Sequence, residues 1–107
     1  STFKAEVYAE SAAGVTSVCT WTRSGTRFSR NYKAYLIDRE AGLFGVPLYE
    51  TYVLLHYDGH SLTSVLEADI PSPSPISPDS DFVRAFLADG WLYILSGDSL
   101  IVRAVGA

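Results

Sequence analysis

The chain has few of the residues that would support a disulfide framework, a membrane span or a nucleic-acid interface. Its single cysteine, Cys19, has no partner for an intramolecular disulfide. No apolar run approaches the ~18 residues that a membrane-spanning helix needs. The 8 Lys and Arg residues are scattered and are outnumbered by 12 Asp and Glu residues. We therefore expect neither membrane binding nor nucleic-acid binding.

The N-terminal segment, STFKAEVYAE, is charged and alternating, so it lacks the apolar centre of a signal peptide. A lone cysteine is compatible with a reducing compartment. Together these two features favour a cytoplasmic protein.

The motifs of catalysis and of cofactor binding are also missing. The sequence contains no recognisable Ser-His-Asp spacing, phosphate-binding loop or pair of catalytic carboxylates, and we expect no cofactor. His56, Asp58 and His60 lie close together, but a hairpin turn at Asp58-Gly59 would place the two histidines on opposite faces. We therefore expect no metal site there, and the sequence favours a protein that is not an enzyme.

The densest apolar stretch, residues 48–69, predicts a hairpin. Asp58-Gly59 is the strongest two-residue turn signal in the chain, and such a turn fixes the register of the two strands. That register gives one largely apolar face and one mixed face, as expected for an antiparallel pair beside a core. Residues 61–69 also fit a helical spacing, and this alternative stays open.

Two further strand signals precede this hairpin. Clean alternation over residues 3–9 predicts a half-buried leading strand. Residues 15–36 predict a second hairpin, with its turn at Ser24-Gly25. A helix over 29–41 is the alternative, although its charges would oppose the helix dipole.

The rest of the chain divides into four segments. They are an apolar connecting loop over 38–47, an extended Pro- and Ser-rich connector over 71–78, a helix over 78–89 and a terminal hairpin about Gly97-Asp98. The loop either folds over an open end of the core or forms an exposed patch or lid. Ser77 is the expected N-cap of the helix, and Gly90 is its expected terminator. The terminal hairpin would set Tyr93 opposite Val102.

Composition and pattern together predict an α+β fold in a single domain, residues 1–107. Hydrophobic residues make up 48% of the chain and charged residues 19%, which is typical of globular proteins. Three hairpins and the leading strand would form an antiparallel, strongly curled sheet or partial barrel of about seven strands. The late helix, 78–89, would pack across this sheet or close one end of it.

A cation interrupts one face of the predicted 15–36 hairpin. Arg30 would lie opposite Cys19 and beside Tyr32 and Ser17, on a face that is otherwise apolar. A guanidinium in that position must be paired. It would either form an ion pair with a glutamate or hold an anionic ligand, with Tyr32 and Ser17 as hydrogen-bond donors. We name Arg30, Tyr32, Ser17 and Cys19 as candidate ligand-binding residues.

Apolar residues in excess of what one core can bury mark candidate interfaces. The terminal hairpin is apolar on both faces, and a helix of about twelve residues, ~18 Å long, cannot cover the face that the core leaves. The candidate interface residues are Leu43, Phe44, Val46, Leu92, Ile94 and Ile101. A two-fold homodimer is the simplest cover for them.

The sequence therefore favours a non-catalytic protein-binding or assembly protein that acts as a homo-oligomer. The alternative is a small-molecule-binding protein or a small enzyme. Its site would be the interior of the curled sheet around Arg30 and Tyr32.

Overall fold

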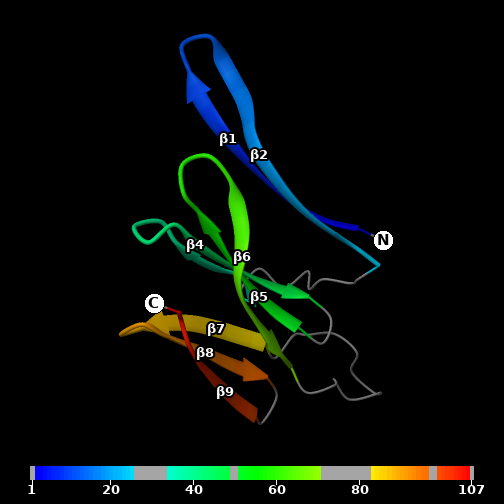
Figure 1. Cartoon of the computed structure of the whole chain (residues 1–107), viewed down its shortest axis with the longest axis vertical. Helices are drawn as coiled ribbons and strands as arrows, with labels where there is room; N and C mark the ends of the chain where they lie inside the picture. The colour runs from blue at the N-terminus through cyan, green and yellow to red at the C-terminus, as the bar shows by residue number, and fades with distance from the viewer. Residues whose placement is uncertain (1, 26–33, 49–50, 71–82, 97–98, 107) are drawn as a thin grey trace.

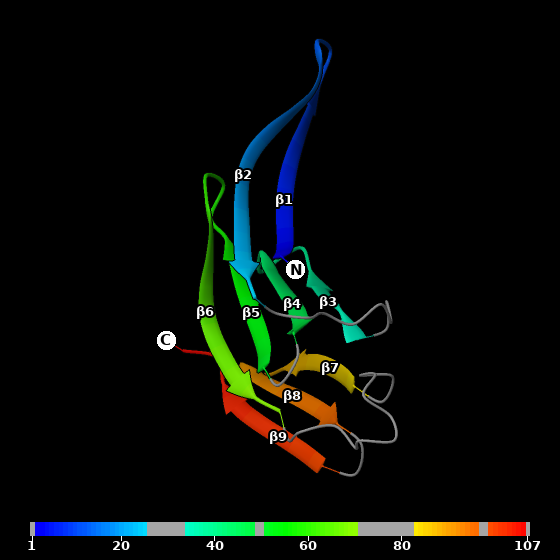
Figure 2. The ribbon, with the colours of Figure 1, turned by 90° about the vertical axis from the view of Figure 1, so that its right-hand side faces the viewer.

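The computed structural model describes residues 2–25, 34–48, 51–70, 83–96 and 99–106, and the regular elements in these ranges are β-strands (Figures 1 and 2). They are β1 (Thr2–Ser11), β2 (Gly14–Ser24), β3 (Leu36–Asp38), β4 (Leu43–Leu48), β5 (Thr51–Tyr57), β6 (Leu62–Asp69), β7 (Val83–Ala88), β8 (Trp91–Ser96) and β9 (Ser99–Ala104). None of the described segments forms a helix that could span a membrane.

The strands form three antiparallel sheets arranged in layers (Figure 1). We call the pair β1-β2 the ribbon, the sheet β3-β4-β5-β6 the central sheet, and the sheet β7-β8-β9 the terminal sheet. The ribbon packs on one face of the central sheet, and the terminal sheet packs on the other. Both views show the far end of the ribbon projecting beyond the other two layers (Figures 1 and 2).

The predicted α+β fold is wrong. The structure is nearly all antiparallel β, in three separate sheets of which none is closed or strongly curled. The physical reason is that the central sheet is apolar on both faces. A sheet of this kind needs a cover on each side, and stacked layers supply two covers where curling would supply one.

The helix predicted over 78–89 is not present. Residues 83–88 form β7, which pairs with β8 across a two-residue turn. The turn residues, Asp89 and Gly90, have φ angles of 52° and 81°, and positive φ at both positions is the mark of the hairpin turn that favours Asp-Gly. Gly90 therefore ends a strand pair instead of terminating a helix. Residues 78–82 lie outside the described residues.

The first strand of the hairpin predicted over 15–36 is present as β2. This strand pairs with the leading strand β1, which confirms the strand predicted over 3–9 and sets Cys19 opposite Val7. The pairing needs only the short connection between Ser11 and Gly14, and consecutive strands usually pair. The predicted partner segment, 26–33, lies outside the described residues.

The segment 38–47, predicted as a loop, belongs to a third hairpin. β3 and β4 pair across a tight turn in which the Asp38 carboxylate accepts the Ala41 N–H at 3.2 Å. The Gly42 N–H donates to the Arg39 carbonyl at 3.3 Å, and Gly42 has a φ of 68°. The apolar residues after this turn are therefore strand residues of the core.

The hairpin predicted about Asp58 and Gly59 is present, and β6 confirms a strand where a helix was the alternative. Its loop runs from Asp58 to Ser61, because the Asp58 N–H donates to the Ser61 carbonyl at 3.2 Å and Tyr57 pairs with Leu62. The predicted two-residue loop was therefore too short. The Asp58 carboxylate holds this wider loop, as described below.

A β-bulge then changes the register within β6. Leu55 pairs with Ser64, whereas the adjacent Leu54 pairs with Leu66, so Val65 is an extra residue. Because strand side chains alternate between faces, the extra residue reverses the alternation. Apolar residues before the bulge face the ribbon, and those after it face the terminal sheet.

The terminal hairpin has the predicted register. Tyr93 lies opposite Val102, and Ile94 lies opposite Ile101. The turn residues Gly97 and Asp98 lie outside the described residues.

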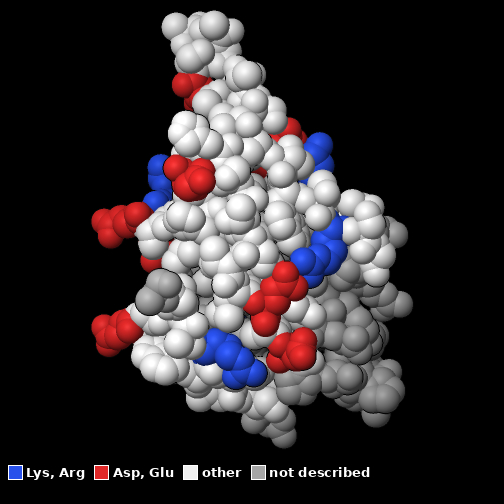
Figure 3. Space-filling model, in the orientation of Figure 1, with Lys and Arg blue, Asp and Glu red and all other residues white. Residues whose placement is uncertain are grey.

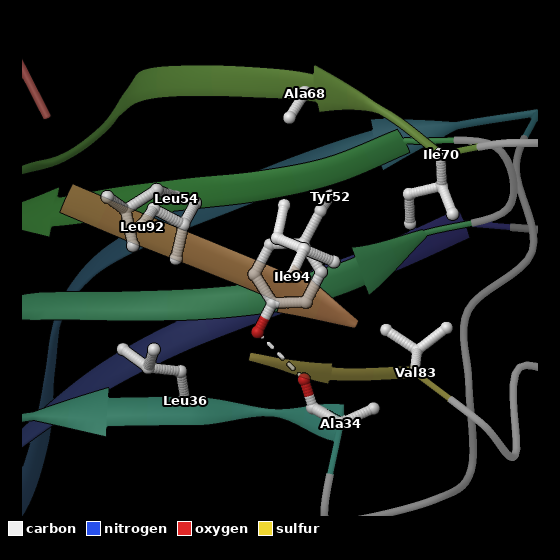
Figure 4. Close-up of a cluster of buried hydrophobic side chains, with 9 residues drawn as sticks. All are labelled: Ala34, Leu36, Tyr52, Leu54, Ala68, Ile70, Val83, Leu92 and Ile94. Carbon is white, nitrogen blue, oxygen red and sulfur yellow. Dashed lines mark hydrogen bonds between the residues drawn. The ribbon is translucent and has the colours of Figure 1, made fainter. Parts of the chain in front are cut away.

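Two apolar cores flank the central sheet. The core on the ribbon side contains Phe3, Val46, Leu48, Val53, Leu55 and Leu62. The core on the terminal side contains Ala34, Leu36, Tyr52, Leu54, Ala68, Ile70, Val83, Leu92 and Ile94 (Figure 4). The neighbours Val53 and Leu54 are both 0% exposed on opposite faces of β5, which explains why this strand is a continuous apolar run.

Tyr52 is the one phenol at the centre of the terminal-side core. Its side chain is fully buried, and its hydroxyl donates to the Ala34 carbonyl at 2.7 Å (Figure 4). Burial raises the pKa of this hydroxyl. The ring lies against Gly45, where an added Cβ would stand 2.5 Å from the Tyr52 hydroxyl oxygen. Glycine at this position therefore makes room for the ring.

We predict that Gly45→Ala destabilises the protein by about 1–3 kcal/mol, the usual cost of overpacking a core. Tyr52 cannot yield, because it is fully buried and its hydroxyl is bonded. Thermal denaturation followed by circular dichroism measures the effect. Gly106→Ala is the matched control, since no atom lies within 4 Å of a Cβ added there. Equal melting temperatures for the two variants would contradict the packing of Tyr52 on Gly45.

Candidate functional site

The candidate ligand-binding residues do not form one site among the described residues. Ser17 is exposed, whereas Cys19 is half-buried and packs against the ribbon-side core. A register shift in the ribbon, after Val7 pairs with Cys19 and before Tyr8 pairs with Ser17, puts the two side chains on opposite faces. Arg30 and Tyr32 lie outside the described residues.

Ser17 belongs to a cluster around Glu6. The Ser17 hydroxyl donates to one Glu6 carboxylate oxygen, and the Tyr8 hydroxyl donates to the other at 2.8 Å. The Lys4 ammonium lies 3.2 Å from the same carboxylate. These hydrogen bonds, that from Ser17 first, lower the pKa of Glu6 to about 2. The carboxylate therefore stays charged and satisfied within the ribbon.

Asp58 stabilises the loop between β5 and β6. One of its carboxylate oxygens accepts the backbone N–H groups of His60 and Ser61, both at 2.8 Å. The bond from Ser61, then that from His60, lowers the pKa of Asp58. His56 is half-buried in β5 and His60 is exposed in the loop. In the described ranges no three His, Cys, Asp or Glu residues gather where they could hold a metal ion.

An ion pair joins the ribbon to the central sheet. The Arg23 guanidinium on β2 donates to both carboxylate oxygens of Glu67 on β6, each at 2.8 Å. The guanidinium also lies 5.0 Å from the centre of the Trp21 ring, and the Ser64 hydroxyl donates to Glu67 at 2.9 Å. The hydrogen bond from Arg23 is the largest cause that lowers the pKa of Glu67 to about 2.

We predict that the stabilisation from Glu67 is lost as the pH falls through the acid range. The pKa of Glu67 is lower in the folded state than its ordinary value of 4.5. The contribution of Glu67 to stability is therefore fully present above pH 4.5 and disappears toward pH 2. Glu67→Gln should cost about 1 kcal/mol or less at pH 7, because more than a third of the Glu67 side chain is exposed. Urea denaturation measures this difference across the pH range.

The exposed Glu10→Gln variant is the control for this measurement, since it removes a carboxylate near the far end of the ribbon. The free energies of unfolding of Glu67→Gln and the wild type could differ by the same amount at pH 7 and at pH 2. In that case the pairing of Glu67 with Arg23 would not contribute to stability.

The candidate interface residues lie in the cores of the chain. Leu92 and Ile94 are 0% exposed and Val46 is 4% exposed. Ile101 and Leu43 pack against the terminal-side core, and Phe44 packs against the ribbon-side core. These side chains therefore contribute to packing within one chain. The terminal sheet does carry apolar side chains on both faces, as expected. Its exposed face, however, is the one opposite to these candidate residues.

That opposite side is the strongest candidate surface in the structure. We call it the outer face, and strand register arranges its side chains in three rows: Ala88, Trp91 and Ala104; Phe86, Tyr93 and Val102; Arg84, Leu95 and Leu100. The exposed large apolar side chains among them are Phe86 (48%), Trp91 (45%), Leu95 (41%), Leu100 (57%) and Val102 (36%). Together they form a patch of roughly 400 Å², a size at which exposed patches are often interaction sites.

The outer face carries a stacked aromatic pair and is nearly free of charge. The rings of Phe86 and Tyr93 stack with their centroids 4.9 Å apart and their planes 7° from parallel. Arg84 is the one charged residue in the three rows, and its guanidinium donates to the Val83 carbonyl at 2.8 Å. On the side of the molecule drawn in Figure 3, acidic and basic side chains are scattered without a basic cluster.

Sequence reasoning found only part of this face. The predicted register of the terminal hairpin sets Tyr93 opposite Val102, as the structure does, but Phe86 was expected in a helix. The missing information was which face the rest of the chain would cover. Compared with protein-family models, curated proteins and solved structures, the chain matches none.

Proposed function

We propose that this protein is a non-catalytic protein-binding or assembly protein that acts as a homo-oligomer, most simply a two-fold dimer joined through the outer face. The observation that carries this proposal is the exposure of Phe86, Trp91, Leu95, Leu100 and Val102 on one side of a single sheet. Apolar patches of this size are often interaction sites.

The composition of the outer face supports a second copy of the chain as the partner. Interfaces between identical subunits are more apolar than other interfaces, and their centres are depleted of charge. Phe86, Tyr93 and Val102 form the middle row, whereas Arg84 lies in an end row on the edge strand β7. Two copies packed face to face would therefore enclose the aromatic row and leave Arg84 at the rim, where a charge stays hydrated.

The structural roles of three described carboxylates fit a non-catalytic protein. Glu6 is bonded within the ribbon, Asp58 holds a loop and Glu67 joins two layers. Each of these carboxylates has a structural role that accounts for its charge.

We predict that the wild-type chain is a dimer at high micromolar concentration and that Leu100→Lys is a monomer. Leu100 is 57% exposed, so the protein should tolerate lysine there, whereas a charge buried between two copies would oppose association. Light scattering coupled to size-exclusion chromatography measures the mass. Val15→Lys is the matched control, because Val15 is 65% exposed on the ribbon and away from the outer face.

Ile94→Lys should behave differently from Leu100→Lys. Ile94 is 0% exposed in the core of one chain, so a lysine there should unfold the domain before it affects association. Circular dichroism separates the two effects. A wild-type chain that is monomeric at high micromolar concentration would overturn the proposal of a homo-oligomer.

A further inference from the structure

The chain contains the dipeptide Asp-Gly twice, at Asp58-Gly59 and at Asp89-Gly90. Both pairs lie in hairpin loops and are exposed to solvent. Both glycines are open, because nothing lies within 4 Å of a Cβ added at either position. Glycine has no side chain to shield its amide nitrogen, so the nitrogen can react with the carboxyl group of the preceding aspartate. The two pairs therefore offer the same chemistry at two places in the fold.

The reaction joins the aspartate side chain to the next peptide nitrogen. The glycine nitrogen attacks Cγ of the protonated carboxyl group, and a new C–N bond closes a succinimide ring. The carboxyl hydroxyl and the amide proton leave together as one water molecule. Water then adds at the ring carbonyl that came from the main chain and breaks the original peptide C–N bond. The product is isoaspartate, whose main chain runs through Cγ, and the atoms balance without an oxidant or a cofactor.

Hydrogen bonds protect Asp58 from this reaction. One Asp58 carboxylate oxygen accepts the N–H groups of His60 and Ser61, both at 2.8 Å, and the other accepts the Ser61 hydroxyl at 3.3 Å. Ring closure removes one of these oxygens and pulls Cγ onto the Gly59 nitrogen, so the hydrogen bonds oppose it. The same bonds lower the pKa of Asp58, which leaves less of the protonated acid that loses water.

Asp89 lacks this protection. Its carboxylate accepts no hydrogen bond from the part of the chain that the structure describes, and the Gly90 N–H donates none there. Asp89 is also the one non-glycine residue with a positive φ in the described ranges, at 52°, a conformation that disfavours most L-residues. The carboxyl group and the nitrogen that it would join are therefore both available.

We propose that Asp89-Gly90 is a site of spontaneous main-chain isomerisation, at which Asp89 converts to isoaspartate through a succinimide while Asp58 persists. The hydrogen bonds of the Asp58 loop, which have no counterpart at Asp89 among the described residues, decide between two identical dipeptides. The inference is independent of the proposed self-association, because it needs only the chemistry of one turn.

Isomerisation at residue 89 would alter one end of the terminal sheet. The two-residue turn matches the pairing of Ala88 with Trp91, and isoaspartate adds one carbon to the main chain of this turn. The change would displace the Gly90 carbonyl, which accepts the Val105 N–H at 2.9 Å. Val105 packs against the terminal-side core. A chemical change in the turn would therefore loosen the C-terminal end of the terminal sheet.

The test stores the purified full chain at mildly acidic pH, where more of the carboxyl groups are protonated. Trypsin cleavage after Arg39, Arg84 and Arg103 puts residues 58 and 89 in different peptides, and electron-transfer mass spectrometry distinguishes isoaspartate from aspartate in each. Isoaspartate should form about tenfold faster at residue 89 than at residue 58, the effect of one hydrogen bond to a charged group. In urea the two rates should converge, because the fold alone distinguishes the two dipeptides.

Two asparagine variants give a matched comparison. Asp58→Asn and Asp89→Asn keep a side chain that hairpin turns favour before glycine, and the loss of ammonia during ring closure leads to a gain in mass after hydrolysis. Asp89→Asn should deamidate about tenfold faster than Asp58→Asn, since an amide oxygen at residue 58 can still accept the two backbone N–H groups. In the isomerised protein the Val105 amide hydrogen should exchange faster than in the fresh protein.

Three results would overturn the proposal. The first is the absence of isoaspartate at residue 89 in the stored folded chain. The second is its formation at residues 58 and 89 at equal rates in that chain. The third is equal deamidation of the two asparagine variants.

Discussion

The burial of β5 on both faces is the constraint from which the three-layer architecture follows. Val53 and Leu54 are both withdrawn from water, so the central sheet needs a cover on each side. The ribbon supplies one cover and the terminal sheet supplies the other. Tyr52 adds a polar requirement, because its buried hydroxyl needs a partner and finds it in the Ala34 carbonyl. This bond fixes the segment that leads into β3 against a strand two places away in the sheet.

Local patterns predicted the strands of this protein better than their partners. The alternation over 3–9 and the register of the terminal hairpin depend on neighbouring residues, and both are confirmed. The helix over 78–89 failed because Ala85 and Phe86 fit a helical spacing as well as a strand, and a short apolar run does not distinguish the two. The Asp89-Gly90 pair carried the deciding signal, which is the same signal that located the hairpin at Asp58.

The candidate surface depended on a non-local fact that the sequence does not contain. Pattern alone showed that the terminal strands are apolar on both sides, and it correctly set Tyr93 opposite Val102. Which side meets the central sheet is decided by the packing of Leu92 and Ile94. An irregularity in the ribbon likewise places Ser17 and Cys19, two of the expected ligand-binding residues, on opposite faces.

The bulge at Val65 reverses which face of β6 is apolar. Leu62 belongs to one core and Leu66 to the other, although they are on the same strand. One extra backbone residue thus lets a single strand serve two separate hydrophobic compartments. Such a strand is sensitive to the number of its residues as well as to their identity. Losing one residue at this point would turn the apolar side chains beyond it toward the wrong layer, even if every remaining residue were conserved.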